Sequence, residues 1–135
     1  MSSEEPFVLR PIGHVESALV DPRAAPKQAS EGAPQAWLVI DPAVGEGLRD
    51  LRAGDEVLVL TWLHRARRDV LAVHPRDDPA ASEAGVFSTR SADRPNPIGI
   101  HRTQIVATDG LRILVSHLEA VDGTPIVDLK PVLGR

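Results

Sequence analysis

The chain has 135 residues, enough for one domain with its own hydrophobic core, and no cysteine, which excludes disulfides, thiolate metal sites and cysteine nucleophiles. Its 15 basic and 19 acidic residues give a net charge of -4, which argues against a protein held to nucleic acid by a broad basic surface. The N-terminus is acidic and polar, and no apolar run approaches the roughly 20 residues that cross a bilayer, so we expect a cytoplasmic protein with no membrane partner.

The first half of the chain reads as short strands and one short helix. Twelve prolines and ten glycines divide the sequence into segments whose apolar residues alternate or are β-branched, which is typical of β structure. The pattern predicts a first strand over residues 7–17, interrupted at Pro11, and a second strand over residues 36–41. The only plausible helix, one or two turns within residues 43–56, would be capped by Gly54.

The second half contains the most apolar strand and a hairpin. Residues 56–63 form a near-continuous apolar run, which predicts a central strand buried on both faces, and residues 69–73 predict another strand. Asp109 and Gly110 separate two further apolar-rich runs and predict a hairpin with a tight turn. The last predicted strand covers residues 125–129.

Six to eight short strands and hardly any helix predict a mainly β fold: a single small β-barrel with one short helix, because closing the sheet removes exposed strand edges. We expect one domain over residues 1–135, with residues 1–6 a disordered tail. Residues 18–35 are long, proline-rich and without periodicity, which is typical of a functional or mobile loop.

One polar cluster stands out at residues 88–99, which read STRSADRPNPIG. Arg90 and Arg94 supply hydrogen-bond donors, and the prolines on either side of Asn96 hold this side chain in a stiff loop that loses little entropy on binding a ligand. A stiff surface turn with solvated arginines is an equally good interpretation of the composition alone.

Two further clusters are candidates for binding. Asp122 beside Gly123 combines a hydrogen-bond acceptor with a backbone that a ligand can approach closely, although such pairs are mostly plain turns. His64 and Arg65 follow the apolar strand, where polar residues reach a barrel rim, and residues 67–68 read as a solvated turn.

The remaining histidines are scattered without metal-ligand spacing, so we expect no metal. The sequence also has no GxSxG, P-loop or GxGxxG motif, which excludes the usual hydrolase and nucleotide-binding folds.

Three blocks together resemble the TsaA-like (TrmO, VirR) family. They read GVFSTRS at residues 85–91, RPNPIG at residues 94–99, and DGTP followed by DLKP within residues 122–131. The resemblance runs from Ile12 to Pro131 and so covers nearly the whole chain. The family contains β-barrel methyltransferases that use S-adenosylmethionine, and its characterised bacterial member N6-methylates threonylcarbamoyladenosine beside the anticodon of threonine tRNA.

The resemblance implies a small barrel, usually paired as a homodimer, with the cofactor S-adenosylmethionine along the barrel mouth. The cofactor residues that it implies are Pro26, Lys27, Gln28, His64, Arg65, Arg90, Ile100, Val121, Asp122, Gly123 and Thr124. This set includes all the clusters found from the residues alone. Arg94 and Asn96 are expected to shape their loop or to contact the acceptor substrate.

The implied chemistry depends on positioning, because a sulfonium methyl group is already activated for in-line transfer. Asp122 would hold the ribose or amino group of the cofactor, and the backbone near Ile100 would seat the adenine. A base is needed only around or after transfer to an amine, and His64 is the candidate.

The acceptor stays open between tRNA and a smaller amine or hydroxyl compound. Lys27 stands where the family has arginine, and Trp62 is the sole aromatic residue in the segment EVLVLTWLH that ends at His64, where the family has several. Members that modify tRNA continue into a further C-terminal domain beyond the point where this chain stops. Two other classes are a non-catalytic S-adenosylmethionine-binding module and a structural barrel that pairs with an enzyme.

Overall fold

Six strands close into a barrel in the computed structural model, which describes residues 6–21, 32–75 and 78–133. In chain order they are β1 (Gly13–Glu16), β2 (Ala36–Ile40), β3 (Glu56–Trp62), β6 (Ile98–Asp109), β7 (Arg112–Val115) and β8 (Pro125–Pro131). Around the barrel the order is β1-β2-β7-β6-β3-β8, and the neighbouring strands are antiparallel. The predicted mainly β barrel is confirmed.

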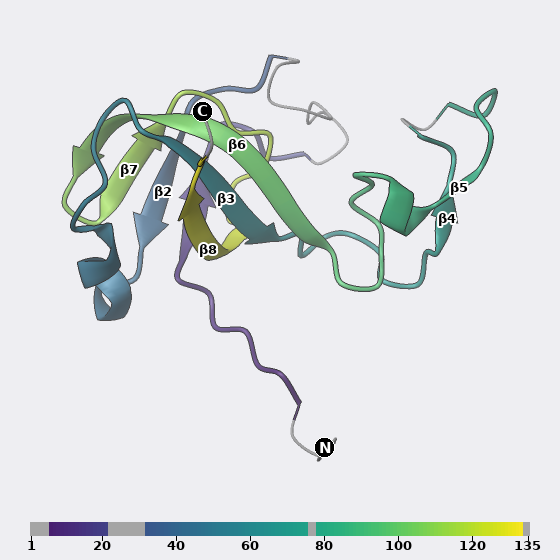
Figure 1. Cartoon of the computed structure of the whole chain (residues 1–135), viewed down its shortest axis with the longest axis horizontal. Coiled ribbons are helices and arrows are strands. Elements are labelled where there is room, and N and C mark those ends of the chain that lie inside the picture. The colour runs from purple at the N-terminus through teal and green to yellow at the C-terminus, as the bar shows by residue number, and fades with distance from the viewer. Residues whose placement is uncertain (1–5, 22–31, 76–77, 134–135) are drawn as a thin grey trace.

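A small second sheet lies outside the barrel. It consists of β4 (Ala72–Val73) and β5 (Ala84–Gly85), and a 3-10 turn, η5 (Val86–Ser88), follows it. Figure 1 shows this lobe on the right, beyond the end of β3 and the start of β6. Of the strand predicted over residues 69–73, only β4 forms, because its partner is the two-residue β5 rather than a barrel strand.

The barrel has one apolar interior, and strand alternation fills it. Along β3, Val57, Val59 and Thr61 are buried while the intervening side chains are only partly buried. The prediction that this strand is buried on both faces is therefore wrong: the run is apolar on both sides, but only the barrel interior excludes solvent. The core consists of Val15, Ala36, Leu38, Ile40, Val57, Val59, Ile105, Ile113, Val115, Leu118, Ala120 and Ile126.

The predicted hairpin is confirmed between β6 and β7, with its two-residue loop one position later than the predicted Asp109–Gly110 pair. Asp109 pairs with Arg112, so Gly110 and Leu111 are the two loop residues. Gly110 has a φ of +61°, which a residue without a Cβ adopts at no steric cost.

The first strand is shorter than predicted. It begins only at Gly13, after Pro11, which has no N–H to donate to a ladder, and residues 6–10 lead away from the barrel (Figure 1). Glycine is needed at residue 13, since a Cβ there would lie 2.1 Å from the carbonyl oxygen of Val39 on β2.

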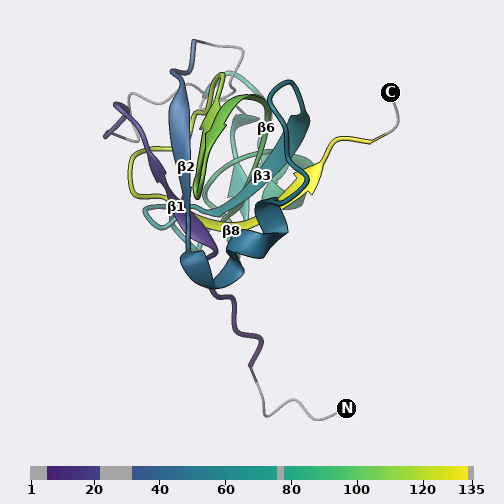
Figure 2. The ribbon, with the colours of Figure 1, turned by 90° about the vertical axis from the view of Figure 1, so that its left-hand side faces the viewer.

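The predicted helix is a 3-10 helix, η3 (Pro42–Leu48), at the end of the barrel where β2 ends (Figure 2). Asp41 caps it by accepting a 2.9 Å hydrogen bond from the N–H of Ala43. Gly54 is not its cap: with a φ of +98° it lies in the turn before β3 and donates its N–H to Ile105 O at 2.8 Å.

Some predictions concern residues outside the described ranges. They include residues 1–5 of the predicted tail and residues 22–31 of the long proline-rich segment. Within the described ranges, no helix has the length and apolar character needed to cross a membrane.

Candidate functional site

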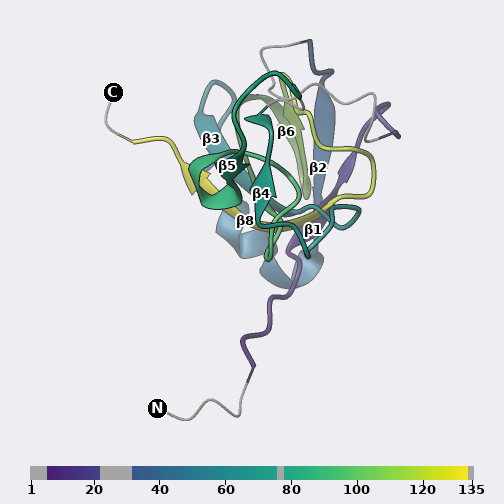
Figure 3. The same ribbon diagram turned by 90° about the vertical axis from the view of Figure 1, so that its right-hand side faces the viewer.

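The loops that carry the predicted polar clusters after β3, before β6 and before β8 lie at one end of the barrel, which we call the mouth. At the mouth β1 and β3 end, at Glu16 and Trp62, and β6 and β8 begin, at Ile98 and Pro125. Antiparallel pairing of β3 with both β6 and β8 brings these strand ends together. The loops after β3, before β6 and before β8 therefore converge, and the β4–β5 lobe extends from the first two of them (Figure 3).

A tight turn over residues 121–124 leads into β8. The N–H and the hydroxyl of Thr124 both donate to the carbonyl oxygen of Val121, at 3.2 and 2.7 Å. Thr124 is buried and its hydroxyl closes the turn, and Val121 is also buried. Asp122 and Gly123 are exposed, so they are the members of this predicted set that a ligand reaches first.

Asp122 fastens this turn to the chain that follows β1. One carboxylate oxygen of Asp122 accepts a 3.0 Å hydrogen bond from the N–H of Ser17, and its own N–H donates to Leu19 O at 2.6 Å. Gly123, with a φ of +83°, donates its N–H to Val15 O at 2.7 Å. A Cβ built on Gly123 meets no atom of the described residues within 4 Å, so these residues leave space beside the turn.

Arg65 reaches the same segment from the other side. Its Nη1 donates to the carbonyl oxygen of Val20 at 3.1 Å, across 45 residues of sequence. His64, its neighbour, is exposed in the turn after β3. The structure therefore brings Arg65 and Asp122 to one stretch of chain, which leads toward the predicted cofactor residues 26–28 outside the described ranges.

Arg94 shapes the loop that holds it. Its guanidinium donates to Val86 O at 2.6 Å, Thr89 O at 3.0 Å and Ser91 O at 2.9 Å, and the side chain is partly buried. The three carbonyls belong to η5 and the turn after it, whose amide groups lack strand partners. The predicted loop-shaping role of Arg94 is thus observed, and contact with an acceptor stays a prediction.

Arg68 departs from the solvated turn that the sequence predicts. Although exposed, it donates to Pro95 O at 2.7 Å and to Asn96 Oδ1 at 3.0 Å, and it lies over the ring of Trp62. Arg67 does behave as a solvated residue: it pairs in solvent with Asp69, and the hydrogen bond from Arg67 lowers the pKa of that carboxyl below its ordinary value.

Among the described residues, no hydrogen bond or ion pair joins Arg90 or Ile100 to the turn at residues 121–124. Arg90 is exposed on the loop after η5, where the described part of the chain offers its guanidinium no hydrogen-bond partner. Ile100 is 39% exposed on the outer face of β6, opposite Leu60 of β3. The part of Arg90 and Ile100 in a cofactor site therefore stays a prediction.

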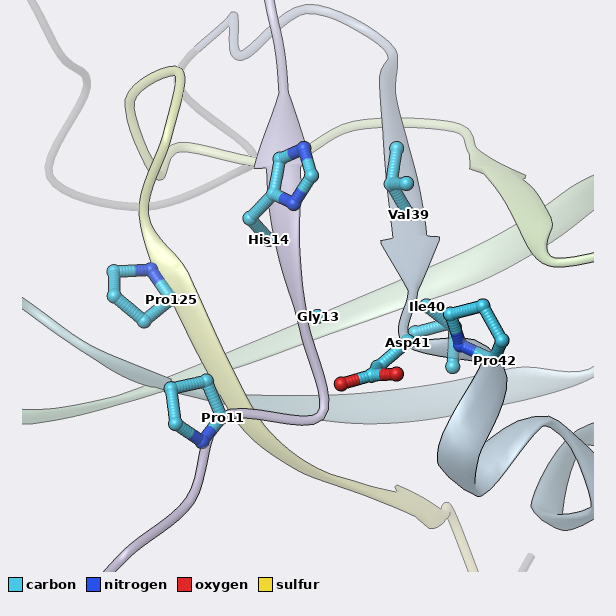
Figure 4. Close-up of a pocket in the computed structure, with 8 residues that line it drawn as sticks. All are labelled: Pro11, Gly13, His14, Val39, Ile40, Asp41, Pro42 and Pro125. Atoms are coloured by element: carbon cyan, nitrogen blue, oxygen red, sulfur yellow. The ribbon is translucent and has the colours of Figure 1, made fainter.

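Two surface cavities lie apart from the predicted site. One, of about 480 Å³, is lined by β1, β2 and the segments beside them (Figure 4), and its residues are Pro11, Gly13, His14, Val39, Ile40, Asp41, Pro42 and Pro125. The other, of about 320 Å³, lies between η3 and β8. Neither contains a described residue of the predicted cofactor set, although Pro125 of the first cavity directly follows Thr124.

The motifs and the fold converge on one family. A family model described as the tRNA-methyltransferase O N-terminal domain matches residues 14–135. The chain belongs to the TrmO N-terminal domain family. This confirms the resemblance carried by the RPNPIG and DGTP motifs, and the mouth residues come from the loops in which these TrmO-family motifs lie.

Relatives of this TrmO domain carry names that mention S-adenosylmethionine. A probable S-adenosyl-L-methionine-binding protein of Archaeoglobus fulgidus is 41% identical over 123 residues, which is 91% of this chain and 33% of that protein. An S-adenosyl-L-methionine-binding protein of the same organism is 36% identical over 124 residues, 92% of this chain and 88% of that protein.

The solved structures give the same family. A crystal structure of TrmO from Pseudomonas aeruginosa is 26% identical with a TM-score of 0.74, over 96% of this chain and 57% of that one. This chain thus spans about a third of the first relative and little more than half of the TrmO chain, so the activity of the longer proteins enters below as a proposal.

Sequence reasoning missed a buried group at the mouth: Thr61, His101 and Glu119, which hydrogen-bond to one another. The available signal was the placement of His101 on the interior phase of β6, where the strand otherwise buries small or apolar residues. Its partners lie 40 and 18 residues away in sequence, so only the strand register reveals them.

Proposed function

We propose that the protein binds S-adenosylmethionine at the barrel mouth and methylates N6 of threonylcarbamoyladenosine beside the anticodon of tRNA. One observation carries the proposal. Arg65 and the Asp122 turn, which belong to predicted cofactor clusters far apart in sequence, both bind the backbone of residues 15–20. Membership of the TrmO N-terminal domain family and the names of its relatives support the cofactor.

The described residues fit such a ligand. The Asp122 carboxylate uses one oxygen for Ser17, which leaves the other for a ribose hydroxyl or an ammonium group. The described residues leave space beside Gly123, so ligand atoms can approach its backbone. Arg90 presents an unpaired guanidinium among the described residues, suited to a carboxylate.

S-adenosylmethionine supplies a methyl group that its sulfonium sulfur already activates. The protein therefore has to align the acceptor with that group, and the stiff loop braced by Arg94 and Arg68 supports this task. His64, exposed beside Arg65, is the proposed base for the proton released by the acceptor amine. A tRNA substrate would place the protein in the cytoplasm.

We also propose that the chain forms a homodimer through the β4–β5 lobe. Phe87 is 81% exposed and Leu71 67% exposed on this projecting lobe, and a second copy would remove both from water. Light scattering coupled to size exclusion should show a dimer that Phe87→Ser converts to a monomer. A monomeric parent protein would contradict this arrangement.

The test of function combines binding with an acceptor screen. Calorimetry with S-adenosylmethionine should show saturable binding by the unchanged protein, and its absence would contradict the proposal. Incubation with labelled cofactor and tRNA that lacks the N6-methyl group, followed by nucleoside mass spectrometry, should then yield N6-methylated threonylcarbamoyladenosine. Binding without a labelled nucleoside would instead support the alternatives, a small amine or hydroxyl acceptor or a non-catalytic binding module.

A further inference from the structure

Three side chains form a buried chain of hydrogen bonds at the mouth. Thr61 on β3 and His101 on β6 point into the barrel, with Thr61 Oγ1 2.7 Å from His101 Nε2. His101 Nδ1 contacts Glu119 Oε1, in the segment between β7 and β8. Thr61 and His101 are almost fully buried, and the Glu119 side chain is 14% exposed. A carboxylate is thus held inside the end of the barrel at which the cofactor is proposed to bind.

The hydrogen bonds define what each group donates. An ionised carboxylate can only accept a hydrogen bond, so we assign the ring proton of His101 to Nδ1, which donates it to Glu119 Oε1. In the neutral imidazole Nε2 is then an acceptor for the Thr61 hydroxyl, and the negative charge of the three groups lies on Glu119. Its second oxygen, Oε2, is buried and has no hydrogen-bond partner among the residues that the structure describes. A buried charged oxygen without a partner is costly, and such groups occur where function uses them.

Glu119 is linked to two predicted cofactor segments, to one through its partner His101 and to the other along the chain. His101, its partner, directly follows Ile100, and Glu119 precedes Val121 by two residues. Its sequence neighbours Leu118 and Ala120 are buried in the apolar core, so water screens the carboxylate weakly. An electrostatic attraction from Glu119 therefore extends to a ligand at the mouth without direct contact.

We propose that Glu119 is a specificity-determining residue that makes the site prefer a positively charged ligand. The inference rests on the proposed function and deepens it. S-adenosylmethionine carries a sulfonium charge that its product, the thioether S-adenosylhomocysteine, lacks, while the two share their remaining groups. Glu119 thereby retains the methyl donor and favours release of the product, and His101 and Thr61 position it.

The test compares the two ligands by calorimetry. The unchanged protein should bind S-adenosylmethionine on the order of tenfold more tightly than S-adenosylhomocysteine, since tenfold corresponds to about 1.4 kcal/mol of differential charge interaction. Glu119→Gln keeps an acceptor for His101 but removes the charge, and it should abolish most of the preference by weakening S-adenosylmethionine alone. Glu46→Gln is the matched control: it removes an exposed charge from η3, at the opposite end of the barrel, and should leave the ratio unchanged.

The other possible results of this experiment contradict either the role of Glu119 or the proposed function. Equal affinities in the unchanged protein, or a preference that survives Glu119→Gln in full, would overturn the role of Glu119 and leave the proposed cofactor intact. No binding of either ligand by the unchanged protein would overturn the proposed function and this inference with it. If Glu119→Gln fails to fold in a thermal melt, Glu119→Asp, which keeps the charge, must retain the preference, and its loss there also overturns the role.

Discussion

Arg68 lies over the indole of Trp62, with its Cζ 5.1 Å from the ring centroid, and holds the loop before β6 against the end of β3. Its Nε donates to Pro95 O and its Nη2 to Asn96 Oδ1, so one guanidinium makes a stacking contact and two hydrogen bonds. The prolines stiffen the loop, and Arg68 fixes where the stiff loop stands relative to the barrel.

Removing this clamp should loosen the mouth. We expect Arg68→Ala to lower the free energy of unfolding by about 1 kcal/mol, because an exposed cation–π contact contributes ~0.5–1 kcal/mol and part of the hydrogen bonding is lost with it. Thermal and urea denaturation measure the change. Arg67→Ala is the matched control: among the described residues the Arg67 side chain pairs only with exposed Asp69, and its backbone hydrogen bonds to Asp93 and Arg94 survive the change, so stability should stay unchanged. Equal losses in both variants would contradict a specific clamp.

Substitutions of Arg94 and Arg90 should have different effects, the first on folding stability and the second on ligand affinity. Arg94→Ala removes the guanidinium donor of Thr89 O and Ser91 O, while Val86 O keeps the N–H and hydroxyl of Thr89, and the change should cost about 2 kcal/mol of folding stability. Arg90→Ala should leave the melting temperature unchanged but weaken S-adenosylmethionine on the order of tenfold, since hydrogen bonds to charged groups contribute ~1.5–3 kcal/mol. Calorimetry with unaltered affinity for Arg90→Ala would remove Arg90 from the proposed pocket.

Replacing Asp122 by asparagine tests whether its negative charge contributes to cofactor binding, because the two side chains have nearly the same shape. Asp122→Asn keeps an oxygen to accept from Ser17, so folding stability should stay at the parent value while affinity for S-adenosylmethionine falls. Asp122→Ala should lose affinity too and also about 1 kcal/mol of stability, because the Ser17 N–H loses its acceptor. Full affinity in Asp122→Asn would show that the carboxylate charge has no part in binding.

Local sequence signals predicted the features that depend on neighbouring residues. The hairpin followed from the Asp109–Gly110 pair, and the turn at Asp122 and Gly123 from the glycine that its positive φ requires. The family motifs also pointed to Arg65, Asp122 and Gly123, and the strand order brings the two loops that carry these residues to one end of the barrel.

Features that depend on register or on the reach of long side chains were not predictable. The apolar sequence of β3 does not show that only one face of the strand is buried, because this depends on the closure of the barrel. Arg94 and Arg68 read alike as cationic loop residues, and only the fold shows which carbonyls each guanidinium meets. The Thr61–His101 contact arises because β3 and β6 pair with Thr61 opposite Gly99.

Gly99 tests that last arrangement directly. A Cβ on Gly99 would lie 2.5 Å from Thr61 Oγ1 and 2.8 Å from His101 Nε2, inside the space that their hydrogen bond occupies. Gly99→Ala should therefore force the two side chains apart and lower the free energy of unfolding by about 1–3 kcal/mol, the usual cost of overpacking. Gly47→Ala, where a Cβ meets no atom within 4 Å, is the control and should be neutral in the same urea titration. Equal free energies of unfolding for the two alanine variants would contradict this prediction. They would show that the barrel interior accommodates a Cβ at residue 99 and that the Thr61–His101 hydrogen bond does not require glycine there.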